Sequence, residues 1–203
     1  MTESPLETEV KFYVRDLARI EQRLLDLGAS LIQPRILEIN LRFDLPDRSL
    51  SAGQRALRLR QDSEARLTYK GPPQHADKVS TRIELEFTVG DFETARQTLG
   101  ALGYVEIASY EKYRATYQLD DFHIMLDELP YGDFIEIEGT STDSIHTMAD
   151  RLELDWNAAV ENSYLALFEH FRAARGIQST ALTFAALGKN RPGPDELNVH
   201  PAD

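Results

Sequence analysis

The sequence predicts an α+β fold in which antiparallel strands close into a barrel with a charged interior and helices on its outside. Seven short stretches alternate charged with apolar residues, and a strand with this pattern has one charged and one apolar face. The charges on these faces often form closely spaced like pairs, such as Glu7 with Glu9 and Arg58 with Arg60. Four amphipathic helices are also predicted, and they can cover the apolar outside of such a barrel.

Length and composition limit the class of protein. With 203 residues the chain can form one domain with a full core, or at most two small ones. The net charge of −12 argues against nucleic acid or an anionic membrane as a partner. Cysteine is absent, which excludes disulfides, thiol catalysis and thiolate metal sites. We find no signal segment and no apolar run of membrane length, so we expect a cytoplasmic protein.

The first elements of the chain are a predicted strand over about residues 6–14 and a predicted helix over 16–28. Asp16 is suited to be the N-cap of this helix, and Gly28 is suited to end it. Apolar side chains recur at helical spacing at Leu17, Ile20, Leu24 and Leu27.

A clean alternation then predicts a strand over 36–45. Its polar face carries Glu38, Asn40, Arg42 and Asp44. Two shorter strands, 55–61 and 65–70, are predicted to form a hairpin. Gly71 and the two prolines after it begin a loop that runs to about residue 79.

The second half of the chain repeats this plan. A strand over 80–89 precedes a helix over 91–103. A Glu-x-Glu motif followed by a capped helix that ends in Leu-Gly therefore occurs twice, from Glu7 and from Glu84. This weak internal repeat suggests two half-barrels with related layouts. Further strands are predicted over about 110–118, 121–128 and 133–139.

Two helices are predicted near the end of the chain, over 143–153 and about 157–175. Residues 176–203 contain three prolines and end in polar residues. We therefore predict one domain over 1–175 and a C-terminal tail over 176–203 that is partly docked or flexible, with residues 182–184 as a docking contact.

The direction of the charged faces decides the function. An antiparallel sheet usually buries its apolar face and leaves its charges in water, so any single stretch can simply be a solvated face. Like charges two residues apart on one face lie roughly 7 Å apart and repel unless an ion or an opposite charge relieves them. A wide, wet interior holding a ligand gives these groups a use, because basic side chains clamp the roughly four negative charges of a triphosphate. Carboxylates take a divalent cation such as Mg²⁺ or Mn²⁺.

Several motifs follow one another along the chain in a characteristic order. They are Glu7-x-Glu9-x-Lys11, Arg58-x-Arg60, Lys70-Gly71, Glu84-x-Glu86, Lys112-x-Arg114, Asp127 and Gly132-Asp133-Phe134-x-Glu136-x-Glu138. Over about residues 5–170 this pattern resembles the CYTH, or triphosphate tunnel metalloenzyme, superfamily. The resemblance implies an eight-stranded antiparallel barrel that forms a tunnel. Members include class IV adenylate cyclases, thiamine triphosphatases and inorganic triphosphatases.

The resemblance also implies roles for residues of this chain. The metal-site candidates for Mg²⁺ or Mn²⁺ are Glu7, Glu9, Glu84, Glu86, Asp127, Glu136 and Glu138. The candidates for binding the triphosphate are Lys11, Arg58, Arg60, Lys70, Arg82, Lys112 and Arg114. Lys11 and Lys70 are in addition the candidate catalytic residues.

The residues leave the reaction open between three classes. We favour a class IV adenylate cyclase-like enzyme that converts ATP to cyclic AMP and pyrophosphate. An inorganic or nucleoside triphosphatase is the alternative, and a non-catalytic polyphosphate or nucleotide sensor is a third. Thiamine triphosphate is disfavoured, because Arg42 stands where thiamine triphosphatases have tyrosine and Trp156, the only tryptophan, lies far along the chain. The implied partner is a small triphosphate-containing molecule, and members of the family are often dimers, so a homodimer is compatible with the resemblance.

Overall fold

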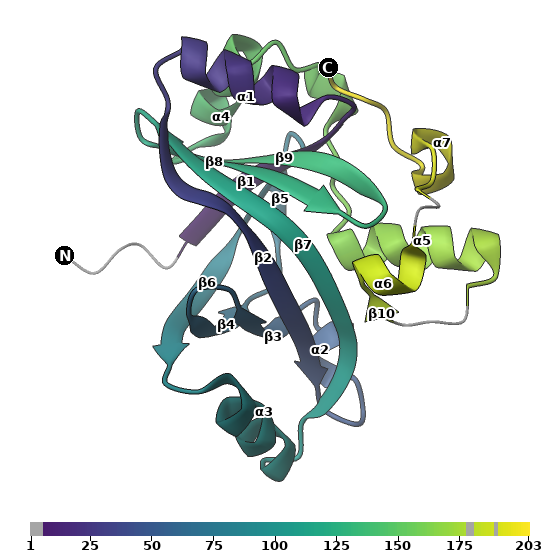
Figure 1. Cartoon of the computed structure of the whole chain (residues 1–203). Helices are drawn as coiled ribbons and strands as arrows, with labels where there is room; N and C mark the ends of the chain where they lie inside the picture. Colours follow the sequence, from purple (N-terminus) through teal and green to yellow (C-terminus); the bar gives the residue numbers. More distant parts are fainter. Residues whose placement is uncertain (1–5, 178–180, 189–190) are drawn as a thin grey trace.

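The computed structural model describes residues 6–177, 181–188 and 191–203. Its main strands are β1 (Leu6–Val14), β2 (Ser30–Asp44), β3 (Ala56–Gln61), β4 (Ala65–Lys70), β6 (Val79–Val89), β7 (Val105–Leu119), β8 (Phe122–Leu129) and β9 (Gly132–Glu138). They are hydrogen-bonded in the order β1-β9-β8-β7-β2-β3-β4-β6, and β6 returns to β1 (Figure 1). This closed antiparallel barrel of eight strands confirms the predicted fold. Within the described residues, no helix is both long and apolar enough to cross a membrane.

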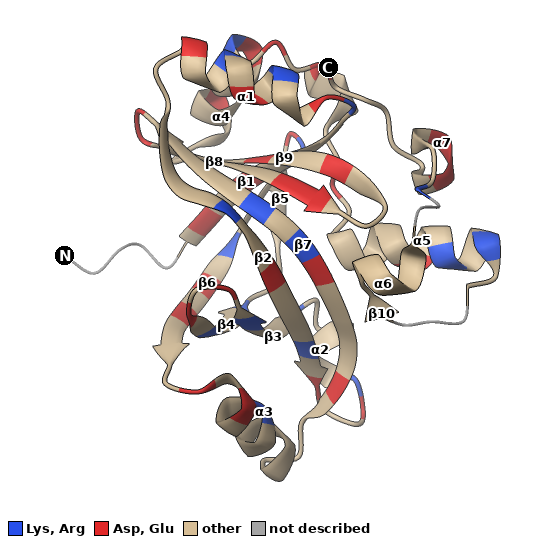
Figure 2. Cartoon of the chain, in the orientation of Figure 1, with Lys and Arg blue, Asp and Glu red and all other residues tan. Residues whose placement is uncertain are grey.

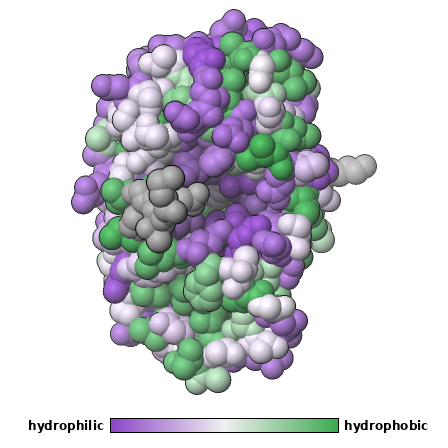
Figure 3. Space-filling view, turned by 90° about the vertical axis from the view of Figure 1, so that its left-hand side faces the viewer, coloured by the Kyte–Doolittle hydropathy of each residue, from purple (hydrophilic) through white to green (hydrophobic). Residues whose placement is uncertain are grey.

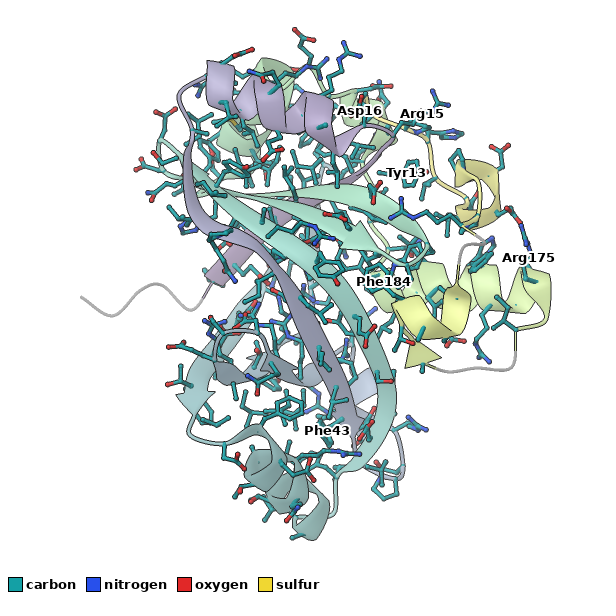
Figure 4. All side chains as sticks on the ribbon, in the orientation of Figure 1. Tyr13, Arg15, Asp16, Phe43, Arg175 and Phe184 are labelled. Carbon is teal, nitrogen blue, oxygen red and sulfur yellow. The ribbon has the colours of Figure 1, made fainter. Side chains whose placement is uncertain are left out.

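Helices lie against the outside of the barrel at three places. They are α1 (Leu17–Asp26), α2 (Ser49–Ala52), α3 (Phe92–Ala101), α4 (Thr142–Arg151), α5 (Tyr164–Arg175), α6 (Phe184–Leu187) and α7 (Pro194–Leu197). In Figure 1, α1 and α4 cover one end, α3 covers the opposite end, and α5 to α7 lie along one side. Each group has its own apolar core: Ile20 of α1 and Ile145 of α4 are fully buried in the first, and Leu99 of α3 packs with Phe43 of β2 in another (Figure 4).

The helical cover is incomplete, most clearly over β6. Three apolar side chains on the outward face of β6 remain about half exposed: Ile83 at 49%, Leu85 at 53% and Phe87 at 58%. Leu6, which is paired with Ile83 across β1 and β6, is also exposed. The expected coat of helices therefore protects most of the barrel's apolar outside but leaves the outer face of β6 open.

Two strands are longer than the sequence predicts. β2 begins at Ser30 and β7 at Val105, and the two pair along most of their lengths. The register shifts between Leu31 and Gln33 and again between Gln33 and Ile36, around Pro34. These irregularities interrupt the simple alternation, which explains why the pattern revealed only the later part of β2.

The predicted helix over 157–175 is wrong in its first part. Trp156–Ala158 form a single 3-10 turn, and α5 begins only at Tyr164, after the Ser163 side chain accepts a hydrogen bond from the Ala166 N–H. The intervening backbone pairs with β1 instead, because the Val160 N–H donates to the Lys11 carbonyl at 2.7 Å.

The described C-terminal residues contact the rest of the domain. β10 (Ala181–Leu182) runs parallel to β7, and Leu182 is fully buried. The Asp203 carboxylate accepts hydrogen bonds from the N–H groups of Arg15 and Asp16 at the start of α1 (Figure 4). The predicted division of the chain at residue 175 remains a prediction, and residues 178–180 and 189–190 of the tail lie outside the described part.

Candidate active site

The charged faces of the strands point into the barrel. A cavity of about 740 Å³ occupies the interior, and Figure 3 shows hydrophilic residues gathered at a hollow in one face of the molecule. Figure 2 shows acidic and basic positions on the strands that surround this interior. All the sequence-predicted site residues except Asp127 line the cavity: Glu7, Glu9, Lys11, Arg58, Arg60, Lys70, Arg82, Glu84, Glu86, Lys112, Arg114, Glu136 and Glu138.

One wall of the cavity, on β1, β6 and β9, is rich in carboxylates. Lys70 Nζ lies 2.8 and 2.7 Å from the two carboxylate oxygens of Glu7 and 2.5 Å from Glu84 Oε2. Arg82 donates to Glu7 at 3.2 Å and to Glu9 at 2.8 Å. Two cations therefore hold three carboxylates together in this wall.

Glu138 lies in the same wall, and no lysine or arginine in the described part of the chain forms an ion pair with it. Glu138 is directly opposite Glu9 in the pairing of β1 with β9. Burial, together with the negative charges of Glu7, Glu9 and Glu84, raises the pKa of Glu138 to about 7. The wall therefore carries more negative charge than its own lysine and arginine balance.

A second network lies between β7, β8 and β9. Lys112 Nζ donates to Asp127 at 2.9 Å, Arg114 Nε donates to the same carboxylate at 2.6 Å, and the Tyr164 hydroxyl donates to it at 2.8 Å. Asp127 is fully buried and does not line the cavity, unlike the other metal-site candidates. The structure thus places Asp127 behind the two basic residues, where it fixes their positions.

Glu136 joins this network to the cavity. It pairs with Lys11 at 3.2 Å and with Arg114 at close range, and the Lys11 ammonium lies 4.3 Å from the centre of the Tyr164 ring. Burial alone would raise the pKa of Glu136, but the positive charges of Lys11 and Arg114 outweigh burial and hold it well below its ordinary value. Glu136 is therefore an ionised carboxylate that positions two cations.

Several residues of the site are not among those predicted from the sequence. Glu38 is 1% exposed and pairs with Arg60 at 3.5 Å and with Lys112 at 3.6 Å. Burial opposes its ionisation, yet Lys112, Arg114 and Arg60 together lower its pKa to about 2. Arg42, Tyr110 and Tyr164 also line the cavity. The alternation over 36–45 places Glu38 and Arg42 on one polar face. They are not a like-charged pair, which is the signal that identified the other site residues.

The carboxylate-rich wall fits a hard divalent cation by its donor chemistry. Mg²⁺ and Mn²⁺ prefer carboxylate oxygens, and the raised pKa of Glu138 marks a place where positive charge is favoured. Within the described residues, no three acidic or histidine side chains converge closely enough to form a ligand cluster as they stand. Lys70 and Arg82 occupy these carboxylates, so a cation would have to take their place.

Comparisons with known proteins agree with this architecture. The CYTH domain family model matches residues 5–172. A Methanocaldococcus jannaschii protein named "Putative adenylate cyclase MJ0240" is 33% identical over 141 residues, covering 68% of this chain and 79% of that protein. Adenylate cyclase CyaB of Aeromonas hydrophila is 28% identical over 176 residues, covering 80% and 88%.

A solved structure extends the likeness to almost the whole chain. It is HpAC1 from Hippeastrum, described as a "putative adenylyl cyclase" with a dominant triphosphatase activity. Its TM-score is 0.56 at 21% identity, and the match covers 96% of this chain and 100% of that one. At this identity the likeness concerns the fold alone. The family match over most of the chain, together with the 33% identical relative, shows that this protein belongs to the CYTH domain family.

Proposed function

We propose that this protein is a divalent-metal-dependent enzyme that binds a triphosphate inside the barrel and converts ATP to cyclic AMP and pyrophosphate. The observation that carries the proposal is the cavity of about 740 Å³ lined by the seven predicted basic residues and by a separate cluster of carboxylates. The cavity also has apolar lining residues, such as Met125 and Leu165, but its many charged groups decide which ligand it suits. It suits a small, highly charged anion that arrives with a cation.

The basic residues bind and orient the phosphate chain in this proposal. Each of Lys11, Lys70 and Arg82 is held by carboxylates in the free protein. Phosphate oxygens compete for the same donors, and charge-assisted hydrogen bonds to them are among the strongest in proteins. Lys11 and Lys70 are partly buried ammonium groups, and we assign to them the stabilisation of charge that develops on the phosphate during reaction.

The carboxylate-rich wall would hold the cation. Glu7, Glu9 and Glu138 are its best-placed ligands, because they lie on the neighbouring strands β1 and β9. Glu84, Glu86 and Glu136 also line the cavity and complete the candidate set. When bound, Mg²⁺ or Mn²⁺ supplies positive charge against the phosphate oxygens. Asp127 serves in this proposal to hold Lys112 and Arg114 in position.

The choice of cyclase over hydrolase rests on the relatives. Both sequence relatives reported above carry the name adenylate cyclase. A triphosphatase is the second candidate, because a structural relative with the same fold is described as having a dominant triphosphatase activity. Thiamine triphosphate is a poor candidate, since the Trp156 ring packs against Phe12 and His146 and does not line the cavity.

Product analysis tests this proposal. Purified protein is incubated with ATP, and separately with tripolyphosphate, in the presence of Mn²⁺ or Mg²⁺. We expect cyclic AMP and pyrophosphate from ATP. Orthophosphate without cyclic AMP would instead identify a triphosphatase. Tight binding of either compound with no product would identify a sensor and would refute catalysis.

A further inference from the structure

Arg42 on β2 and Arg58 on β3 are directly opposite each other in the antiparallel pairing of the two strands. Both side chains line the central cavity, so the two positive charges face the same space. Like charges at directly opposite positions of an antiparallel pair destabilise it. An anion bound between the two guanidinium groups would remove this repulsion.

The next pair along the same two strands shows a second irregularity. Asn40 is directly opposite Arg60. Asn40 is fully buried, and neither its amide nitrogen nor its amide oxygen has a hydrogen-bond partner among the described residues. The buried Nε atoms of Arg42, Arg58 and Arg60 also have no hydrogen-bond partner there, although Arg60 Nε lies 3.8 Å from an Asp62 carboxylate oxygen. Buried polar atoms are rarely left without partners. The unpartnered atoms of this wall include the acceptors Glu38 Oε2 and Asn40 Oδ1, and Asn40 lines neither cavity. The free donors that a bound anion can reach are therefore those of the cavity-lining arginines, Arg42 and Arg58 among them.

Arg42 differs from the other basic residues of the cavity because it has no carboxylate partner. Within residues 6–177, 181–188 and 191–203, its guanidinium takes part in no hydrogen bond and no ion pair. The nearby Asp44 carboxylate instead accepts hydrogen bonds from the N–H groups of Leu45, Leu50 and Ser51. Burial, and then repulsion from Arg58 and Arg82, lowers the pKa of Arg42 against favourable contributions from Tyr110 and, more weakly, Asp44.

The position of Arg42 shows which part of a ligand it would meet. Arg42 lines the central cavity and also a second cavity of about 320 Å³. Glu9, Lys11 and Arg82 line both cavities as well, so the two spaces adjoin. Arg55 and Lys78 add positive charge to the second one. Arg42 therefore stands where the phosphate-binding cavity meets a further basic space.

We propose that Arg42, together with Arg58, forms an additional anion-binding subsite that holds the phosphate group at the end of the triphosphate nearest the second cavity. This inference rests on the proposed function, because it assumes that a triphosphate occupies the barrel. Arg42 supplies a forked N–H donor set to the phosphate oxygens. Arg42 breaks no ion pair when the anion binds. The binding free energy of its contact with the phosphate is therefore not reduced by the loss of a carboxylate partner.

Calorimetric titration of tripolyphosphate into the purified protein, in the presence of Mn²⁺, tests the subsite. Arg42→Gln is expected to weaken binding about 10- to 100-fold, the range for a lost hydrogen-bonded charge contact. Arg42→Lys keeps the charge without the fork and is expected to lose less. Arg66→Gln is the matched control, because Arg66 lines the same cavity but is already paired with Asp62 and Glu64. We expect this control to change affinity by less than about threefold.

A second measurement separates ligand binding from a structural role. Removal of the partly buried, unpaired charge of Arg42 is expected to raise the melting temperature of the ligand-free protein, while the stabilisation by tripolyphosphate shrinks. The same affinity in Arg42→Gln as in the wild type, or a loss no greater than in Arg66→Gln, would overturn the subsite. A lowered melting temperature with unchanged affinity would do so too. If the wild type binds no tripolyphosphate, the proposed function fails first and this inference fails with it.

Discussion

Glu9 on β1 and Glu138 on β9 face each other as a directly opposed pair inside the barrel. Arg82 donates to Glu9 at 2.8 Å, but no cation is paired with Glu138 among the described residues. Two carboxylates in this relation cannot both be ionised without cost unless positive charge is added. The pair therefore defines the place in the barrel where a divalent cation would be bound most favourably.

Replacement of Glu9 by Gln removes one of the proposed ligand charges and keeps the side-chain shape. We expect the affinity for Mn²⁺ to fall by at least about 10- to 100-fold. Loss of a residue that only hydrogen-bonds to a metal ligand already weakens metal binding by that much. Turnover should be lost with it. Calorimetric titration with Mn²⁺ measures the affinity directly.

Glu169→Gln is the matched control, because Glu169 lies on α5 and pairs with Arg172 away from the cavity. Equal Mn²⁺ affinity in the Glu9 variant and in this control would remove Glu9 from the metal site.

The raised pKa of Glu138 predicts a pH-dependent stability of the metal-free protein. Between the ordinary pKa of 4.5 and the folded value of about 7, the folded state holds a proton that the unfolded state has released. The contribution of Glu138 to stability therefore falls as pH rises through this window. Glu138→Gln removes the group that ionises.

In EDTA at pH 8 we expect Glu138→Gln to raise the melting temperature by about 3–6 °C, after allowance for solvent screening of a partly exposed group. At pH 5 the change should be small. Thermal melts at the two pH values measure the difference, and a variant that is equally or less stable at pH 8 would disprove the raised pKa.

Asp127 provides a test that separates a structural from a metal-binding carboxylate. It is fully buried and accepts from Lys112, Arg114 and Tyr164. Asp127→Asn removes the carboxylate that Lys112 and Arg114 share and leaves them only Glu38 and Glu136 as charge partners, so we expect the free energy of unfolding to drop by about 3–5 kcal/mol. Denaturant titration gives this value. A stable variant with weakened Mn²⁺ binding would show that Asp127 is a metal ligand after all.

The sequence predicts the barrel well because its charges are placed with strict strand parity. Glu7, Glu9 and Lys11 alternate with apolar residues, and this alone fixes which side chains share a face. The structure brings these three residues to the cavity, as expected from an inward charged face. The alternation also places Asp127 on the inward face of its strand, but it does not show how deeply a side chain is buried. Asp127 is fully buried, and one of its contacts is with Tyr164 of α5, which is distant in sequence.

Other features depend on contacts between distant segments, and local pattern cannot supply them. Residues 159 and 160 read as helix, yet the Val160 N–H donates to the Lys11 carbonyl and α5 starts only after Ser163. The pairing of Arg42 with Arg58 likewise requires the register of β2 on β3. Each residue is visible in the sequence, but their opposition is visible only in the folded barrel.

The central claim is that the interior of the barrel binds a triphosphate through its basic side chains. Titration of tripolyphosphate into the wild type and into a variant carrying both Arg58→Gln and Lys70→Gln tests it most directly. We predict one tripolyphosphate per wild-type chain and at least about 100-fold weaker binding in the double variant. Equal affinity in the two proteins, or no binding to the wild type, would contradict the claim.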